Sequence, residues 1–88
     1  MPKSSFATRV REAVKQIPKG ETRSYGEVAR AIGRLGAARA VGQVMKNNHD
    51  PEVPCHRVIR ADGTLGGYNR GGAARKRKIL RNEGTVWK

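Results

Sequence analysis

One short run of the chain combines residue types that could do nucleophilic chemistry. Cys55 is the only cysteine among the 88 residues, and His56 and Arg57 follow it directly within residues 54–59, PCHRVI. A thiol attacks as its thiolate, which at neutral pH needs a nearby proton acceptor or positive charge. His56 and Arg57 could supply these. We therefore predict a reactive Cys55 rather than a buried structural cysteine beside an unrelated histidine.

The same residues limit the other chemistry that this run could do. A single cysteine excludes an internal disulfide, and a reduced thiol fits a cytosolic setting. A metal site is not expected, because Cys55 and His56 are adjacent, His49 is the only other histidine and a second thiol is missing. We expect neither a metal ion nor a cofactor.

The charge balance indicates a polyanionic partner. Lys and Arg number 19 against 7 Asp and Glu, and the net charge of +12 is far more than solubility requires. No apolar run is long enough for a transmembrane helix or a signal peptide. We expect one domain over residues 1–88, without a membrane partner, in the cytoplasm on the nucleoid or in the nucleus.

Two short helices are predicted ahead of the reactive run. Ser24 and Glu27 form a capping-box pattern, which opens a helix that ends at Gly33. A second helix is expected over about residues 37–47, with its apolar positions inward. On so basic a chain, two short helices joined by a glycine-containing turn indicate a helix-turn-helix.

The flanking segments predict the rest of the scaffold. Apolar residues at helical spacing indicate an amphipathic helix from about Phe6 to Ile17. Behind the reactive run, Asp62-Gly63 predicts a β-hairpin between residues 57–60 and 64–65. This hairpin is the expected β structure of the domain.

A last helix is expected from about Ala73 to Asn82 and contains a run of basic residues, 75–78. Such a run is most often a solvated face, but on this chain a phosphate contact is nearly as plausible. The predicted fold class is therefore mostly α with a short β-hairpin.

The reactive run and four further segments, in the same order, resemble the O6-alkylguanine-DNA alkyltransferases, repair proteins that move an alkyl group from damaged guanine to their own cysteine. The further segments are 17–27 (IPKGETRSYGE), 37–42 (AARAVG), 63–68 (GTLGGY) and 82–84 (NEG). Spaced signatures in order are more specific than any one of them. The resemblance implies a winged-helix-like helix-turn-helix domain that performs DNA repair as a suicide enzyme, once per molecule.

The resemblance also implies catalytic roles. Cys55 would accept the alkyl group, and His56 would take the thiol proton through a water while Glu83 orients the imidazole. Tyr25 matches the tyrosine that donates to guanine N3 and bears on the 3′ phosphate. By themselves, Tyr25 would equally be helix packing and Glu83 a helix-end acid.

Three further residues match positions around the substrate pocket. Backbone groups near Val58 and Asn69 would define the guanine edge. Asn48 matches an asparagine that joins the helix-turn-helix to the active-site loop, although its type alone fits a simple turn.

The implied partner is double-stranded DNA that contains O6-alkylguanine, bound by a monomer. The target nucleotide must be flipped out of the stack, and Arg39 matches the arginine finger that fills the gap. In the family this helix lies in the minor groove, where the small residues Ala37, Ala38 and Gly42 would allow a close approach and Gln43 would point outward. Without the resemblance, Arg39 would be a generic surface arginine.

The chain departs from most full-length family members, which carry an additional N-terminal domain of ribonuclease-H-like shape; we expect that domain to be absent here. Small members include alkyltransferase-like proteins, which sense alkylguanine without turnover and commonly replace the cysteine by tryptophan. This chain keeps Cys55, which favours the transferase over that alternative. A Cys-His hydrolase would need a cleft and an oxyanion site, and a basic architectural protein would leave the PCHRVI run unexplained.

Overall fold

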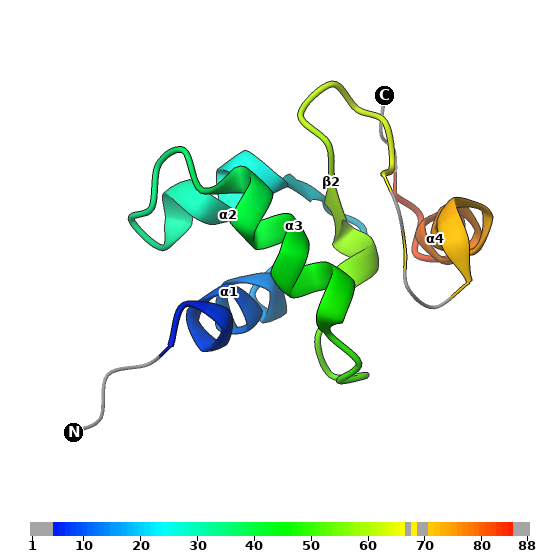
Figure 1. Ribbon diagram of the computed structural model, residues 1–88. Coiled ribbons are helices and arrows are strands. Elements are labelled where there is room, and N and C mark those ends of the chain that lie inside the picture. The colour runs from blue at the N-terminus through cyan, green and yellow to red at the C-terminus, as the bar shows by residue number, and fades with distance from the viewer. Residues whose placement is uncertain (1–4, 67, 69–70, 86–88) are drawn as a thin grey trace.

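The computed structural model describes residues 5–66, 68 and 71–85, and within them the chain is mainly helical (Figure 1). The elements in chain order are α1 (Phe6–Lys15), β1 (Arg23–Ser24), α2 (Tyr25–Ala31), α3 (Ala38–Asn47), the 3-10 turn η1 (Cys55–Arg57), β2 (Val58–Ile59) and α4 (Gly72–Asn82). None of the described helices is both long and apolar enough to cross a membrane.

The helices α2 and α3 form the expected helix-turn-helix. Ser24 Oγ accepts a hydrogen bond from the Glu27 N–H at 3.0 Å, and Glu27 Oε1 accepts one from the Ser24 N–H at 2.8 Å. The predicted capping box is therefore confirmed. Gly33 and Gly36 turn the chain between the helices with φ of 73° and 84°, a conformation that glycine adopts without a Cβ penalty.

The main core lies where α1 packs against α2 and α3. Val10 and Val14 of α1 and Val41 of α3 are fully buried, as the helical spacing predicted. The helix α1 ends at Lys15, shortly before the expected end, and Ile17 is buried beyond it. Pro18 is the reason, because the residue before a proline disfavours the helical conformation.

The β structure differs from the expected hairpin. The strand β2 pairs with β1 in parallel, with Arg23 opposite Val58 and Ser24 opposite Ile59. A tight turn does follow β2, closed by a hydrogen bond from the Arg60 N–H to the Thr64 carbonyl at 3.0 Å. The turn was thus predicted correctly, but the expected second strand at residues 64–65 was wrong.

A side chain explains why the turn does not continue into a hairpin. Asp62 accepts hydrogen bonds from the backbone N–H of Thr64 at 2.9 Å and from its hydroxyl at 2.7 Å. Such local bonds compete with a strand ladder. Leu65 then turns inward, where it is buried in a second cluster with Ile59 and Leu80.

The last helix, α4, lies beyond η1 and β2 and away from α1 (Figure 1). Leu80 anchors it as expected and is fully buried. The basic run on this helix is not a uniformly solvated face. Lys76 is 1% exposed, whereas Arg75, Arg77 and Lys78 are exposed. Only part of that run therefore forms a solvated face.

Candidate active site

The thiol of Cys55 lies at the start of η1, buried against the main core and 5% exposed. Asn48, the residue that ends α3, donates a hydrogen bond from Nδ2 to Cys55 Sγ at 3.1 Å and another to the Asp50 carbonyl at 3.3 Å. Asn48 is itself buried. The end of the second helix of the helix-turn-helix is therefore bonded directly to the sulfur, and an N–H donor favours the thiolate over the thiol.

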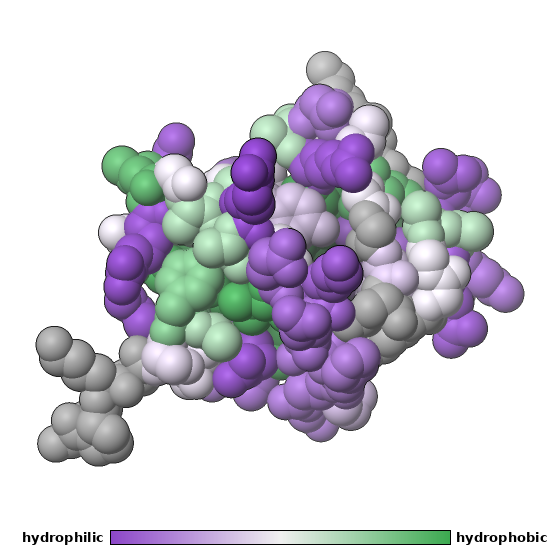
Figure 2. Space-filling model, viewed as in Figure 1, coloured by the Kyte–Doolittle hydropathy of each residue, from purple (hydrophilic) through white to green (hydrophobic). Residues whose placement is uncertain are grey.

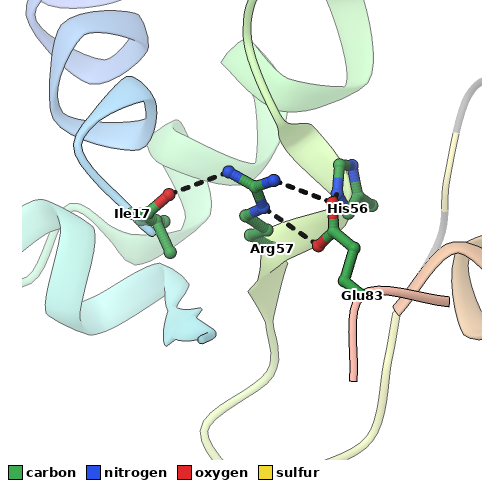
Figure 3. Close-up of polar contacts among 4 residues, drawn as sticks. All are labelled: Ile17, His56, Arg57 and Glu83. Atoms are coloured by element: carbon green, nitrogen blue, oxygen red, sulfur yellow. Dashed lines mark hydrogen bonds and ion pairs between the residues drawn. The ribbon is translucent and has the colours of Figure 1, made fainter. Parts of the chain in front are cut away.

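Next to the thiol, two residues of η1 share one carboxylate (Figure 3). His56 Nε2 lies 2.9 Å from Glu83 Oε2. Arg57 donates to the same side chain through Nε at 3.0 Å and through Nη2 at 2.7 Å, and its Nη1 donates to the Ile17 carbonyl at 2.9 Å. The histidine, the arginine and the glutamate are each only 12 to 16% exposed.

These contacts determine the charge and the proton positions of the cluster. The hydrogen bond from Arg57 holds the pKa of Glu83 below its usual value, with a smaller contribution from His56 and against the opposing effect of burial. The carboxylate is thus ionised at neutral pH and accepts the Nε2–H of His56. In the neutral imidazole, Nδ1 is then the acceptor, as a proton relay from a thiol requires.

The phenol of Tyr25 lies at the start of α2 and near Cys55. Burial raises the pKa of Tyr25. The charge of Arg60 lowers this pKa, and the nearby Cys55 raises it. Gly66 passes so close that a Cβ there would be 3.4 Å from the Tyr25 hydroxyl. The hydroxyl therefore stays protonated at neutral pH and can act as a donor in this part of the site.

Beneath Tyr25 lies a lysine that the sequence analysis assigned to the surface. Lys76 Nζ is 5.9 Å from the centroid of the Tyr25 ring and donates to the Leu65 carbonyl. Burial lowers the pKa of Lys76 to about 8, while the proximity of Cys55 acts in the opposite direction. The spacing did contain a signal, because Lys76 precedes the apolar Ile79 and Leu80 by three and four residues and so shares their helix face.

The expected DNA-contact residues gather on α3 and just before it. Arg39 and Gln43 are exposed, whereas Ala37, Ala38 and Gly42 are partly buried. A Cβ at Gly42 would lie 4.0 Å from the Tyr25 ring, so α3 and the phenol are neighbours. Figure 2 shows hydrophilic side chains over the centre of the face on which α3 lies, with a more hydrophobic area beside them.

Val58 and Asn69 are the other two residues predicted to line the substrate pocket. The side chain of Val58 is fully buried in the core, so only its backbone is available to a ligand. Asn69 lies outside the described residues. Among the expected catalytic residues, the structure pairs His56 with Glu83 and places Tyr25 near Cys55.

Known proteins similar to this chain include methylated-DNA–protein-cysteine methyltransferases. Residues 5–85 match the family model described as the 6-O-methylguanine DNA methyltransferase, DNA binding domain. The methylated-DNA–protein-cysteine methyltransferase of Mycolicibacterium paratuberculosis is 56% identical over 80 residues, which are 88% of this chain and 47% of that protein. The chain spans about half the length of the curated relatives that it matches.

Solved structures give the same fold. Mycobacterium tuberculosis OGT in complex with DNA superposes with a TM-score of 0.86 at 52% identity, over 94% of this chain and 52% of that one. S. pombe ATL in complex with DNA superposes with a TM-score of 0.82 at 43% identity, over 98% of this chain and 82% of that one. The predicted class, mostly α with a winged-helix-like helix-turn-helix, is therefore confirmed.

Proposed function

We propose that this chain, which belongs to the 6-O-methylguanine DNA methyltransferase family, moves an alkyl group from O6-alkylguanine in DNA to its own Cys55. One observation carries the proposal. The buried thiol is bonded to the end of α3 through Asn48, and the residue that follows it forms a histidine-glutamate pair. A thiol bonded to the end of the predicted DNA-contact helix, and followed in the chain by a histidine that a carboxylate holds, supports a nucleophile with a proton acceptor.

The transfer is a displacement at the alkyl carbon. The Cys55 sulfur forms a bond to that carbon as its bond to O6 breaks, and the electron pair of the broken bond stays on the guanine. The thiol proton passes to His56, which Glu83 holds with Nδ1 as the acceptor. Tyr25 donates to the leaving base and so meets the negative charge that develops on it.

The helix α3 brings the damaged base to the thiol. The alkylated guanine leaves the stack, and the exposed Arg39 fills the space that it vacates. Phosphate contacts from the cationic surface supply most of the affinity, so binding is steeply dependent on salt and nearly independent of sequence. The chain acts as a monomer on duplex DNA, in the cytoplasm on the nucleoid or in the nucleus.

A second function has a specific observation in its favour. The structure superposes on S. pombe ATL in complex with DNA with a TM-score of 0.82 at 43% identity, so this fold is shared with that protein as well. In that alternative, the chain binds alkylated DNA without accepting the alkyl group. Cys55, together with its histidine-glutamate neighbours, supports the transferase instead.

Mass spectrometry separates the two functions. The protein is incubated with a duplex that contains O6-methylguanine, and both the intact mass and the peptide that holds Cys55 are measured. Transfer adds one methyl group per molecule to that peptide, and Cys55→Ser prevents it while binding to the duplex persists. Tight binding with an unmodified Cys55 in the wild-type protein would establish the damage sensor and reject the transferase.

A further inference from the structure

Each of the three guanidinium nitrogens of Arg57 donates a hydrogen bond. Two of its nitrogens hold the two oxygens of Glu83, and the third donates to the Ile17 carbonyl at 2.9 Å. The side chain is 16% exposed. Exposed ion pairs contribute little, whereas a shielded two-pronged contact fixes both partners in one geometry.

We propose that Arg57 is a positioning residue, which aims the Glu83 carboxylate at His56 and thereby controls the reactivity of Cys55. The part that Arg57 plays in alkyl transfer rests on the proposed function, whereas its contacts with Glu83 do not. Glu83 Oε2 is shared between Arg57 Nη2 at 2.7 Å and His56 Nε2 at 2.9 Å. If the arginine is removed, the carboxylate is free to rotate away from the imidazole.

The position of Glu83 in the fold explains why it needs this partner. Glu83 is the residue that ends α4, where the partial negative charge of the helix terminus disfavours a carboxylate. The charge of Arg57 opposes that repulsion, and the hydrogen bond that Arg57 donates is the largest cause of the low pKa of Glu83. The other charged groups that line the adjoining hollow are Lys15 of α1 and Glu52 of the loop before η1.

The hydrogen bond from Arg57 to the Ile17 carbonyl connects the cluster to the segment that follows α1. Ile17 lies just beyond the end of α1, so the arginine joins that segment and the end of α4 to the turn that carries the thiol (Figure 3). The three segments are far apart in the sequence, and the bonds of one side chain set their relative placement at the site. A lysine could restore the charge here but not the fork.

The test is the rate at which iodoacetamide alkylates Cys55, measured against pH in the folded protein. Arg57→Met should lower this rate on the order of tenfold at neutral pH, the equivalent of one lost charge-assisted hydrogen bond. The pKa of Glu83 should rise, so the loss of rate on the acid side should begin at a higher pH. Arg57→Lys should fall between the wild type and Arg57→Met.

A double-mutant cycle shows whether Arg57 acts through Glu83. Arg57→Met should slow the reaction in the wild type but have little further effect in the Glu83→Gln background. Equal slowing in both backgrounds would overturn the proposal, because the arginine would then act by another route. Arg23→Met is the matched control, since Arg23 forms an exposed pair with Glu21 at 3.0 Å, and it should leave the rate unchanged.

Two features keep the result interpretable. Circular dichroism of each variant gives its folded fraction, so that rates are compared per folded molecule, and Arg57→Lys remains informative if Arg57→Met does not fold. The assay contains no DNA. A coupled pair in a protein that fails to demethylate DNA would uphold the role of Arg57 and reject the proposed function, and transfer without coupling would do the reverse.

Discussion

The side-chain amide of Asn48 donates a hydrogen bond to the sulfur of Cys55 at 3.1 Å, across seven positions of the chain. Asn48 closes α3, the helix whose surface carries Arg39, and so a single buried side chain connects the expected DNA-contact helix with the nucleophile. A displacement of α3 must therefore alter the surroundings of the thiol.

This contact predicts the effect of Asn48→Ala. The variant should lose about 1–2 kcal/mol of the free energy of unfolding, because the bonds to Cys55 and to the Asp50 carbonyl both disappear from a buried position. Cys55 should also react more slowly with iodoacetamide. Urea denaturation and the alkylation rate measure the two effects. Asn47→Ala, at the exposed neighbouring position, should show neither; a similar loss there would indicate a general weakening of α3.

The burial of Lys76 predicts a gain of stability at alkaline pH. Its pKa falls from 10.5 to about 8 in the folded protein, so between these values the unfolded chain binds more protons than the folded one. The cost of burying the cation is thus complete below about pH 8 and is relieved as the pH rises toward 10.5. The gain should be on the order of 3 kcal/mol.

Lys76→Met removes the cost of burying this cation, because methionine has a similar volume and no charge. Urea denaturation across the same pH range should show that the gain is missing from Lys76→Met but present in Lys78→Met, whose residue is exposed on the same helix. A gain of equal size in all three proteins would mean that another group titrates.

Glu83 predicts a dependence in the same direction, but at acid pH. Its pKa is lowered in the folded protein, so its contribution to stability is present above the ordinary carboxyl value and is lost as the pH falls through the lowered one. Glu83→Gln should therefore be less stable than the wild type at neutral pH, and the difference should shrink in acid. Thermal denaturation from neutral to acid pH measures it. A constant difference would show that packing, not charge, accounts for the loss.

The proposed finger role of Arg39 predicts a contrast between substrates. Arg39→Ala should slow transfer from a methylated duplex by more than tenfold, while its reaction with free O6-alkylguanine should change little, because only the duplex leaves a gap to fill. Methyl transfer from each substrate is measured by mass spectrometry. Arg30→Ala, at an exposed position of α2, serves as the control. Equal losses with both substrates would show that Arg39 supports the fold or the thiol instead.

Local signals in the sequence determined much of the scaffold. Ser24 and Glu27 are three residues apart, so their capping box depends only on the geometry of a single helical turn, and its prediction was confirmed. The apolar spacing in α1 placed Val10 and Val14 in the core for the same reason. The reactive run was visible because Cys55, His56 and Arg57 are consecutive, and the identity of neighbouring residues needs no knowledge of the fold.

Only the tertiary structure decided which distant groups meet. Glu83 reaches His56 across 27 positions, and the pairing of β2 with β1 replaced a hairpin that the local turn signal had indicated. The bonds of Arg57 to Glu83 were not visible in the sequence, and Lys76 is buried although it lies within a basic run. These outcomes depend on which surfaces pack together, because burial and long-range pairing are properties of the assembled fold and not of any short segment.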